Sequence, residues 1–274
     1  IAFTGSTEVG KLIREKTAGS GKSLTLELGG KSPFVVFDDA DLDSAIEGVV
    51  DAIWFNQGQV CCAGSRLLVH EAIAEKFYKK LKARMKTLRL GNPLDKSIDM
   101  GAIIDKKQHE KINRMVSLSN GKVYQADIPL PEEGCFFSPT LITDLHTADP
   151  LMQEEIFGPV LVSTTFRTPS EAIELSNNTT FGLAASIWSE NINLCLELAP
   201  KIKAGVVWIN GTNMFDAAAG FGGLKQSGFG REGGWEGLLA YSKSKKLSPA
   251  TIKGKPLKKQ ISRVDHIDRT AKLY

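Results

Sequence analysis

The sequence of 274 residues has few cysteines and no long apolar run, and each absence excludes a class of protein. No apolar stretch approaches the ~18 residues of a membrane-spanning helix, and the first residues lack the features of a secretory signal. The 4 cysteines form neither a CxxC pair nor a metal-ligand spacing, which disfavours a disulfide scaffold and a metal site. We therefore expect no membrane partner, no bound metal and a cytoplasmic location.

Acidic residues are scarce at one end of the chain, although the formal net charge is only +3. Residues 243–274 carry ten basic and two acidic side chains, a net charge of +8, which leaves −5 for residues 1–242. A basic tail can bind nucleic acid, but residues 243–264 contain no aromatic side chain on which bases could stack. We therefore predict a linker or an oligomerisation arm over 243–274, and no nucleic-acid partner.

Residues 1–242 contain no internal repeat and no low-complexity block. Short apolar runs alternate instead with segments of helical periodicity, which is typical of an α/β fold with a largely parallel sheet. Strands are predicted at residues 1–3, 24–28, 33–37, 65–70, 122–124, 136–142, 159–166, 184–188 and 206–210. Helices are predicted at residues 8–17, from Asp39 or Asp41 towards Phe55, and at residues 73–85, 106–117, 170–176 and 192–202.

Three familiar motifs fail on inspection. Residues 19–23 resemble a phosphate-binding loop, but Lys16 stands where that motif needs its first glycine. Residues 228–233 match GxGxxG, yet they follow no strand, and no acidic residue lies ~20 positions further on. We expect these glycines to let backbone segments pack closely. No GxSxG occurs and the histidines are scattered, so a serine hydrolase triad has no support.

Two positions invite a chemical role. Small and amide residues surround Cys61 and Cys62 just before a predicted strand, where a loop could present a thiol, although a lone cysteine is usually a buried apolar residue. Glu27 precedes Gly29 and Gly30, which leave backbone open to a ligand, although a glutamate on an alternating strand usually faces solvent. The residues alone leave both interpretations open.

Five motifs follow one another along residues 1–241: Phe3-Thr4-Gly5-Ser6-Thr7, Leu26-Glu27-Leu28-Gly29-Gly30-Lys31, Gly58-Gln59-Val60-Cys61, Glu154-Glu155-Ile156-Phe157-Gly158-Pro159 and Lys225-Gln226-Ser227-Gly228. In order and spacing they resemble the aldehyde dehydrogenase superfamily. The resemblance implies the C-terminal part of one module, with the end of a Rossmann-like NAD-binding domain over residues 1–28. An α/β catalytic thiol domain would follow over 29–228, and the chain would return to the cofactor domain over 229–242.

The resemblance implies oxidation of an aldehyde to a carboxylic acid with NAD or NADP. Cys61 would attack the aldehyde as a thiolate, and the resulting thiohemiacetal would lose a hydride to the cofactor and become a thioester. Glu27 would act as the general base that activates the hydrolytic water. Family members that transfer the acyl group to coenzyme A generally lack this glutamate, so Glu27 favours water as the acceptor.

The resemblance also assigns cofactor and substrate residues. Gly5, Ser6 and Val9 match positions around the cofactor pyrophosphate, at a helix start whose N–H groups suit phosphate. The other residues assigned to the cofactor are Leu28, Gln108, Lys111, Glu155 and Phe157. The residues assigned to the substrate pocket are Trp54, Phe55, Phe215 and Phe221, for which ordinary core packing is the alternative.

Several expectations concern the protein as a whole. Residue 1 would lie within a strand, and the family's oxyanion asparagine and adenosine-ribose lysine would precede it, so we expect a fragment that is inactive by itself. Residues 268–274 resemble the entry into another module, which suggests the first module of a two-module protein. A homo-oligomer, in the form of a dimer, is implied as well. The alternative to an enzyme is a catalytically silent scaffold with the same fold.

Overall fold

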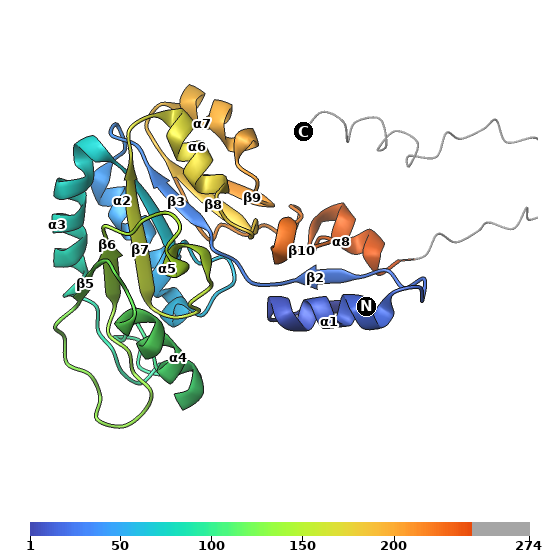
Figure 1. Cartoon of the computed structure of the whole chain (residues 1–274), viewed down its shortest axis with the longest axis horizontal. Coiled ribbons are helices and arrows are strands. Elements are labelled where there is room, and N and C mark those ends of the chain that lie inside the picture. Colours follow the sequence, from blue (N-terminus) through green and yellow to red (C-terminus); the bar gives the residue numbers. More distant parts are fainter. Residues whose placement is uncertain (243–274) are drawn as a thin grey trace, which may run out of the picture. The chain divides into compact units, whose positions relative to one another are not determined.

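Two β-sheets organise the computed structural model, which describes residues 1–242 (Figure 1). The larger sheet has the strand order β5-β6-β7-β4-β3-β8-β9, and all neighbouring pairs are parallel except β5–β6. Its strands are β3 (Pro33–Val36), β4 (Arg66–His70), β5 (Lys122–Gln125), β6 (Thr140–Thr143), β7 (Val160–Phe166), β8 (Ala184–Trp188) and β9 (Val206–Ile209). The predicted α/β fold with a largely parallel sheet is confirmed.

The smaller sheet has three strands, β1 (Ala2–Thr4), β2 (Thr25–Glu27) and β10 (Gly228–Phe229). Strand β1 pairs with β2 in parallel, and β10 pairs with β2 in the antiparallel direction. The smaller sheet thus joins the two ends of residues 1–242, as the resemblance implies, while the domain division at residues 28 and 228 stays a prediction. The linker or arm predicted over 243–274 lies outside the described residues.

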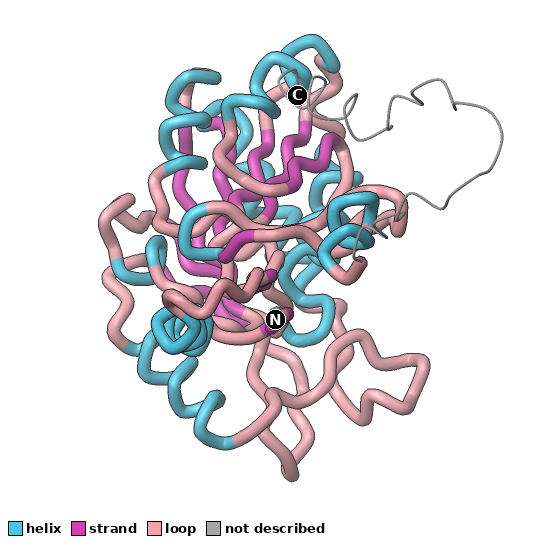
Figure 2. The backbone as a smooth tube through the Cα atoms, turned by 90° about the vertical axis from the view of Figure 1, so that its right-hand side faces the viewer, coloured by secondary structure: helices cyan, strands magenta, loops and turns pink. Residues whose placement is uncertain are grey.

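Alternate residues of β3 point to opposite faces of the larger sheet, as the period of a strand requires. Phe34 and Val36 belong to the cluster formed with α2 (Leu42–Val49) and α3 (Ala74–Met85). Val35, together with Phe37 directly after the strand, belongs to the cluster formed with α6 (Pro169–Asn177) and α7 (Ile192–Leu198). Figure 2 shows the strands lying side by side with helices around them. The larger sheet is therefore covered on both faces, which explains its apolar strands.

Helix α2 leads towards the region of Cys61. Asp41, rather than Asp39, is its N-cap, since the Asp41 Oδ1 atom accepts a hydrogen bond of 2.7 Å from Ser44 N. The helix continues as a π-helix over Val50–Trp54, a form that is frequent near functional sites. Asn56 and Gln57 then adopt left-handed backbone conformations, with φ of 48° and 59°. The predicted helix towards Phe55 therefore exists, but its last turn is not α-helical.

Two of the four remaining helices, α1 and α4, match predicted segments. The four helices are α1 (Thr7–Thr17), α4 (Lys106–Ser117), α5 (Pro150–Gln153) and α8 (Gly234–Ala240). The sequence analysis did not anticipate α5, α8 or β10. The helix predicted at 192–202 ends as α7 at Leu198, and a 3-10 turn follows at Ala199–Lys201, where Pro200 cannot continue the hydrogen-bond ladder. Of the extended segment predicted at 136–142, only residues from Thr140 onwards form a strand.

The GxGxxG segment packs closely against the smaller sheet, as predicted. Gly228 has φ of 113°, and a Cβ atom there would lie 1.8 Å from the Leu26 carbonyl oxygen. A residue with a side chain could not pair with β2 at this distance, so the glycine serves the approach of two strands and not a phosphate group.

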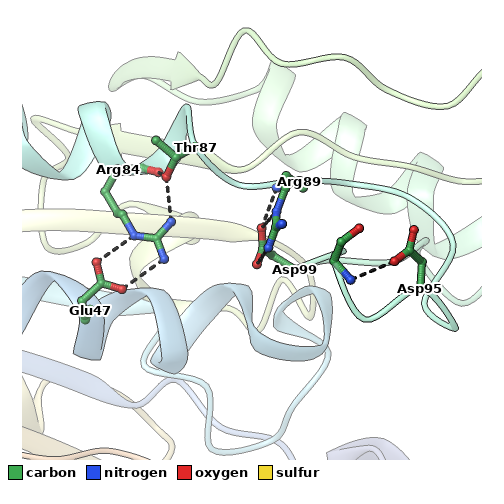
Figure 3. Close-up of polar contacts among 7 residues, drawn as sticks. Glu47, Arg84, Thr87, Arg89, Asp95 and Asp99 are labelled. Carbon is green, nitrogen blue, oxygen red and sulfur yellow. Dashed lines mark hydrogen bonds and ion pairs between the residues drawn. The ribbon is translucent and has the colours of Figure 1, made fainter.

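Ion pairs join α2 and α3 on the surface. Arg84 donates to both carboxylate oxygens of Glu47, at 2.7 and 3.0 Å, and to the Thr87 hydroxyl (Figure 3). Lys80 of α3 also forms an ion pair with Asp43 of α2. Two basic side chains of α3 are therefore paired with acidic side chains of α2. Beyond α3, Arg89 forms a similar two-bond pair with Asp99 (Figure 3).

Glu47→Gln should have a small effect on stability. The two side chains of the Glu47–Arg84 pair are 59% and 30% exposed, so solvent screens the pair, and we expect a loss of only ~0.2–1 kcal/mol in the free energy of unfolding. Urea denaturation measures this loss, with Glu75→Gln on the exposed side of α3 as the control. A loss several times larger would show that the pair carries more than surface charge.

Candidate active site

Loops from both sheets meet at one cavity of about 600 Å³. In the larger sheet, the loops that precede β3, β4 and β7 carry Gly29, Cys61 and Glu155, and parallel strands begin at the same edge of a sheet. In the smaller sheet, the carboxyl ends of β1 and β2 supply Gly5 and Glu27. The lining residues are Thr4, Gly5, Ser6, Glu27, Gly29, Asn56, Gln59, Val60, Cys61, Gln108, Lys111, Glu155 and Phe157.

The loop that presents Cys61 is tied to its surroundings by amide side chains. Gln57 Nε2 donates to the Ala102 carbonyl at 3.1 Å, and Gln59 Oε1 accepts from Ile104 N at 3.0 Å. Gly58 has φ of 69°, and a Cβ atom there would lie 2.2 Å from the Gly158 carbonyl oxygen. The Asn-Gln-Gly-Gln run therefore fixes the loop before Cys61, and glycine is required at its closest contact.

The two adjacent cysteines have opposite pKa shifts. The adjacent Cys62 side chain lowers the pKa of Cys61 below its ordinary value, although burial of Cys61 opposes this shift. The same interaction raises the pKa of Cys62, which is buried and also lies 3.4 Å from the Asn213 Oδ1 atom. Cys61 is half-buried and lines the cavity. Cys61 is thus the more readily ionised thiol of the pair.

Glu27 is buried at the end of β2 instead of facing solvent. Its side chain is 5% exposed, and neither carboxylate oxygen has a hydrogen-bond partner among the described residues. The pKa of Glu27 is raised to about 8, mainly by burial and to a lesser extent by the nearby charges of Glu232 and Cys61, while Arg231 opposes the shift. A carboxylate with a pKa this close to neutrality, free on both oxygens, can accept a proton.

Glu155 is held in the cavity by backbone. Gly30 N donates to its Oε1 atom at 2.9 Å, and a Cβ atom on Gly29 would lie 2.3 Å from its Oε2 atom. Burial raises the pKa of Glu155, whereas the Gly30 hydrogen bond and the charges of Lys111 and Lys31 lower it. The Gly-Gly pair therefore leaves room for a carboxylate whose second oxygen remains free for a hydroxyl group.

Helix α4 contacts the loop that carries Glu155 and Phe157. Gln108 Nε2 donates to the carbonyl oxygens of Ile156 and Phe157, both at 2.9 Å. Lys111 Nζ donates to the Glu155 carbonyl oxygen at 3.4 Å. Phe157 has φ of 56° and is 36% exposed at the cavity. Six of the eight residues assigned to the cofactor thus lie around one cavity.

Val9 and Leu28 do not line this cavity. The side chain of Val9 is 41% exposed, while its backbone N–H donates to Ser6 Oγ, the N-cap of α1, at 3.3 Å. Leu28 is 5% exposed and packs where a Cβ atom on Gly10 would lie. Val9 therefore contacts Ser6 and Leu28 packs against α1, but neither residue lines the cavity.

None of the four aromatic residues assigned to the substrate lines this cavity. Trp54 is 1% exposed in the core cluster under α2 and donates its indole N–H to the Pro159 carbonyl at 3.2 Å. The structure therefore places Trp54 in the core, where it does not contact the cavity. Phe55 is exposed. Phe215 and Phe221 stack edge to face with ring centroids 5.1 Å apart, and Phe221 packs against the cluster that contains Cys62.

Several residues at the site were not assigned from the sequence. Gly30 binds Glu155, Gln59 and Asn56 line the cavity, and Glu232 faces Glu27 from the loop before α8. Lys31 is 1% exposed, its Nζ atom has no hydrogen-bond partner within residues 1–242, and burial lowers its pKa to about 7. The Gly-Gly pair and the Asn-Gln-Gly-Gln run carried a sequence signal, whereas the placement of Glu232 depends only on the tertiary fold.

Two classes of feature are absent from residues 1–242. No three His, Cys, Asp or Glu side chains gather closely enough to hold a metal ion in this part of the chain. Within the same residues, no helix has the length and apolarity to cross a membrane.

Comparison with known proteins identifies the family. The model of the aldehyde dehydrogenase family matches residues 1–247, so the chain belongs to this family. An aldehyde dehydrogenase of Emericella nidulans is 44% identical over 251 residues, which cover 89% of this chain and 50% of that protein. Retinal dehydrogenase 2 of Gallus gallus is 44% identical over 252 residues, which cover 90% of this chain and 49% of that protein.

Solved structures agree with this placement. The crystal structure of betaine aldehyde dehydrogenase from Staphylococcus aureus in complex with NAD⁺ aligns with a TM-score of 0.85 and 40% identity. The alignment covers 88% of this chain and 49% of that one. The chain thus spans about half the length of the relatives that it matches.

Proposed function

We propose that the protein containing this chain oxidises an aldehyde to a carboxylic acid with NAD or NADP as the hydride acceptor. The observation that carries the proposal is the shared cavity of Cys61, an ionisable thiol, and Glu27, a buried carboxylate with no hydrogen-bond partner among the described residues. Membership of the aldehyde dehydrogenase family supports the same chemistry.

Acylation falls to Cys61. Its thiolate sulfur forms a bond to the aldehyde carbon, and the carbonyl oxygen takes the negative charge. A bound nicotinamide ring supplies the acceptor for the hydride that leaves this carbon. Loss of the hydride leaves the acyl group on Cys61 as a thioester. The lowered pKa of Cys61 supports this step because it favours the thiolate form.

Deacylation falls to Glu27. Its carboxylate takes a proton from a water molecule, the water oxygen attacks the thioester carbon, and the Cys61 thiolate leaves as the carboxylic acid forms. The pKa of about 8 makes Glu27 a far better base than an ordinary glutamate. Because Glu27 lies 2.7 Å from where a Cβ atom on Gly222 would stand, glycine at that position leaves space beside its Oε1 atom.

The residues around the cavity fit a dinucleotide. Ser6, the N-cap of α1, lines the cavity, and the N–H groups at this end of the helix suit a pyrophosphate. Across the cavity, the free Oε2 atom of Glu155 can accept hydrogen bonds from ribose hydroxyls, and the Phe157 ring lies beside it. The solved relative from Staphylococcus aureus, which was determined with NAD⁺, supports this assignment.

Substrate contacts are proposed for Phe55, Phe215 and Phe221 only, because Trp54 lies in the core. We also propose that the remainder of the cofactor domain comes from a segment outside residues 1–274, since relatives are about twice as long. The dimer, the cytoplasmic location and the second module stay predictions.

The test is an assay of the complete protein with a panel of aldehydes and with NAD and NADP in parallel. We expect one equivalent of carboxylic acid for each reduced cofactor, without coenzyme A. A reaction that requires coenzyme A would overturn the role of Glu27. Failure to reduce either cofactor with any aldehyde, in a folded protein, would refute the proposed function.

A further inference from the structure

The loop over residues 154–158 joins α5 to β7 in a conformation that needs support. Phe157 has φ of 56°, in the left-handed region that bulky side chains rarely adopt. Such a conformation persists only where the surrounding structure holds it, and it concentrates at binding and catalytic sites. Contacts from neighbouring side chains must therefore stabilise the backbone of Phe157.

Gln108 binds the strained backbone directly. Its single amide nitrogen donates to the carbonyl oxygens of Ile156 and Phe157, both at 2.9 Å. A glutamine amide has two N–H donors, so both are used, and Oε1 is the only polar atom left. Gln108 is itself fixed, because its backbone N–H donates to the α4 N-cap Asp105 at 2.7 Å.

The same helix face also binds the preceding residue. Lys111 lies one turn after Gln108 and donates to the Glu155 carbonyl oxygen at 3.4 Å. Three consecutive carbonyl groups of the loop, at residues 155–157, therefore point towards two side chains of α4. Beneath them, Ile156 and Ile112 are packed in one cluster and are 2% and 0% exposed. The loop is thus held between an apolar contact and a row of donors.

We propose that Gln108 is a positioning residue that holds the left-handed backbone of Phe157. In doing so it directs the Glu155 carboxylate and the Phe157 ring into the cavity. Gln108 acts on a bound cofactor through this loop, and its free Oε1 atom remains able to accept a hydrogen bond in the cavity, a capacity that Gln108→Glu preserves. The effect of Gln108 on cofactor binding rests on the proposed function, whereas its stabilisation of the loop over residues 154–158 does not.

The test uses Gln108→Glu in the complete protein, in three backgrounds. This change keeps an acceptor oxygen of the same size but removes both N–H donors. The backgrounds are wild type, Phe157→Ala and Phe157→Gly. Alanine and glycine both remove the ring, but only glycine adopts positive φ without cost. Comparison of the Phe157→Ala and Phe157→Gly backgrounds therefore separates stabilisation of the backbone by Gln108 from the effects of losing the ring.

The first measurement is hydrogen exchange of backbone amides in residues 154–160 without cofactor. We expect Gln108→Glu to accelerate exchange by on the order of tenfold in the wild-type and Phe157→Ala backgrounds, and much less in Phe157→Gly. Asn113→Asp, which removes an amide on the same helix that bonds to His109, should leave this exchange unchanged. Equal acceleration in all three backgrounds, or none, would overturn the proposal.

A second variant is needed in case Gln108→Glu does not fold. Gln108→Met removes both donors without introducing a charge beside two carbonyl oxygens, and it should give the same order of effects across the three backgrounds. Exchange of residues 66–70 in the buried strand β4 reports whether the fold is intact. If both variants accelerate hydrogen exchange in β4 as much as in the loop, Gln108 stabilises the fold in general and the proposal fails.

The last measurement is the dissociation constant for NAD. We expect Gln108→Glu to weaken NAD binding in the wild-type and Phe157→Ala backgrounds but not in Phe157→Gly. A uniform loss in all three would make Gln108 a direct ligand and refute the positioning role. If the unmodified protein binds neither NAD nor NADP, the proposed function fails, while the exchange result still decides what Gln108 does.

Discussion

Cys61→Ala is expected to abolish aldehyde-dependent NADH formation, with a loss in kcat of ~10³-fold or more. The reason is that the acyl group would have no atom on which to form a thioester. Alanine fills part of the space of the thiol, and the loop before it is held by Gln57, Gln59 and Gly58, so the fold should survive. The measurement is steady-state kinetics of the complete protein, together with trapping of the acyl group by mass spectrometry.

Cys135→Ala is the matched control for this experiment. Cys135 is half-buried like Cys61 but packs in the cluster around α4 and α5, away from the cavity. We expect its removal to leave kcat and the trapped acyl group unchanged. Unchanged NADH formation by Cys61→Ala would remove the thiol mechanism and would favour a scaffold or another nucleophile.

Glu27→Gln should separate the two half-reactions. Acylation needs the thiol and the cofactor, so a first burst of about one NADH per site should remain. Hydrolysis of the thioester needs a base, and its loss typically costs ~10²–10⁴-fold in rate. The variant should therefore accumulate the acyl-enzyme. Pre-steady-state kinetics and mass spectrometry of the trapped thioester measure both effects.

The pH profile gives a second measure of Glu27. Its raised pKa of about 8 means that the protonated acid predominates below this pH and the basic carboxylate above it. Deacylation should therefore increase with pH and level off above an inflection that lies above the ordinary glutamate pKa and below about 8, because the acylated Cys61 no longer carries the charge that raises the pKa of Glu27. Glu27→Gln should lack this inflection. Glu232→Gln removes a charge that raises the pKa of Glu27, so the inflection should move to lower pH. A shift to higher pH would contradict the assignment.

Local pattern predicted most of the elements that build the fold. The apolar periodicity of residues 73–85 and 106–117 gave α3 and α4 almost to the residue, because each helix buries one regular stripe. The strand at residues 184–188 was predicted in full, because it is a buried apolar run between turn residues. The π-helix and the left-handed Asn56 and Gln57 were not predicted, because tertiary contacts of the loop select them.

Some residues of the candidate site were likewise predicted from the sequence, and others were not. Motif order and the resemblance singled out Cys61, Glu27 and Glu155, and the structure places all three around one cavity. Trp54 was assigned to the substrate pocket because aromatic type and position are all that a sequence offers, and burial under α2 moves it to the core. Conversely, Glu232 carried no local signal, since 205 positions separate it from the Glu27 carboxylate whose pKa it raises.

The sequence by itself therefore determined the α/β fold class, the family and the side chains that could carry the chemistry. These follow from local periodicity and from residue types at short, characteristic spacings. Only the tertiary structure decided that Glu27 is buried with no hydrogen-bond partner in the described part of the chain, and that Gln108 uses both amide donors on the backbone around Phe157. It also decided that Val9, Leu28 and Trp54 do not line the cavity. Burial, pKa and hydrogen-bond saturation depend on which distant segments pack together, and no local pattern encodes that packing.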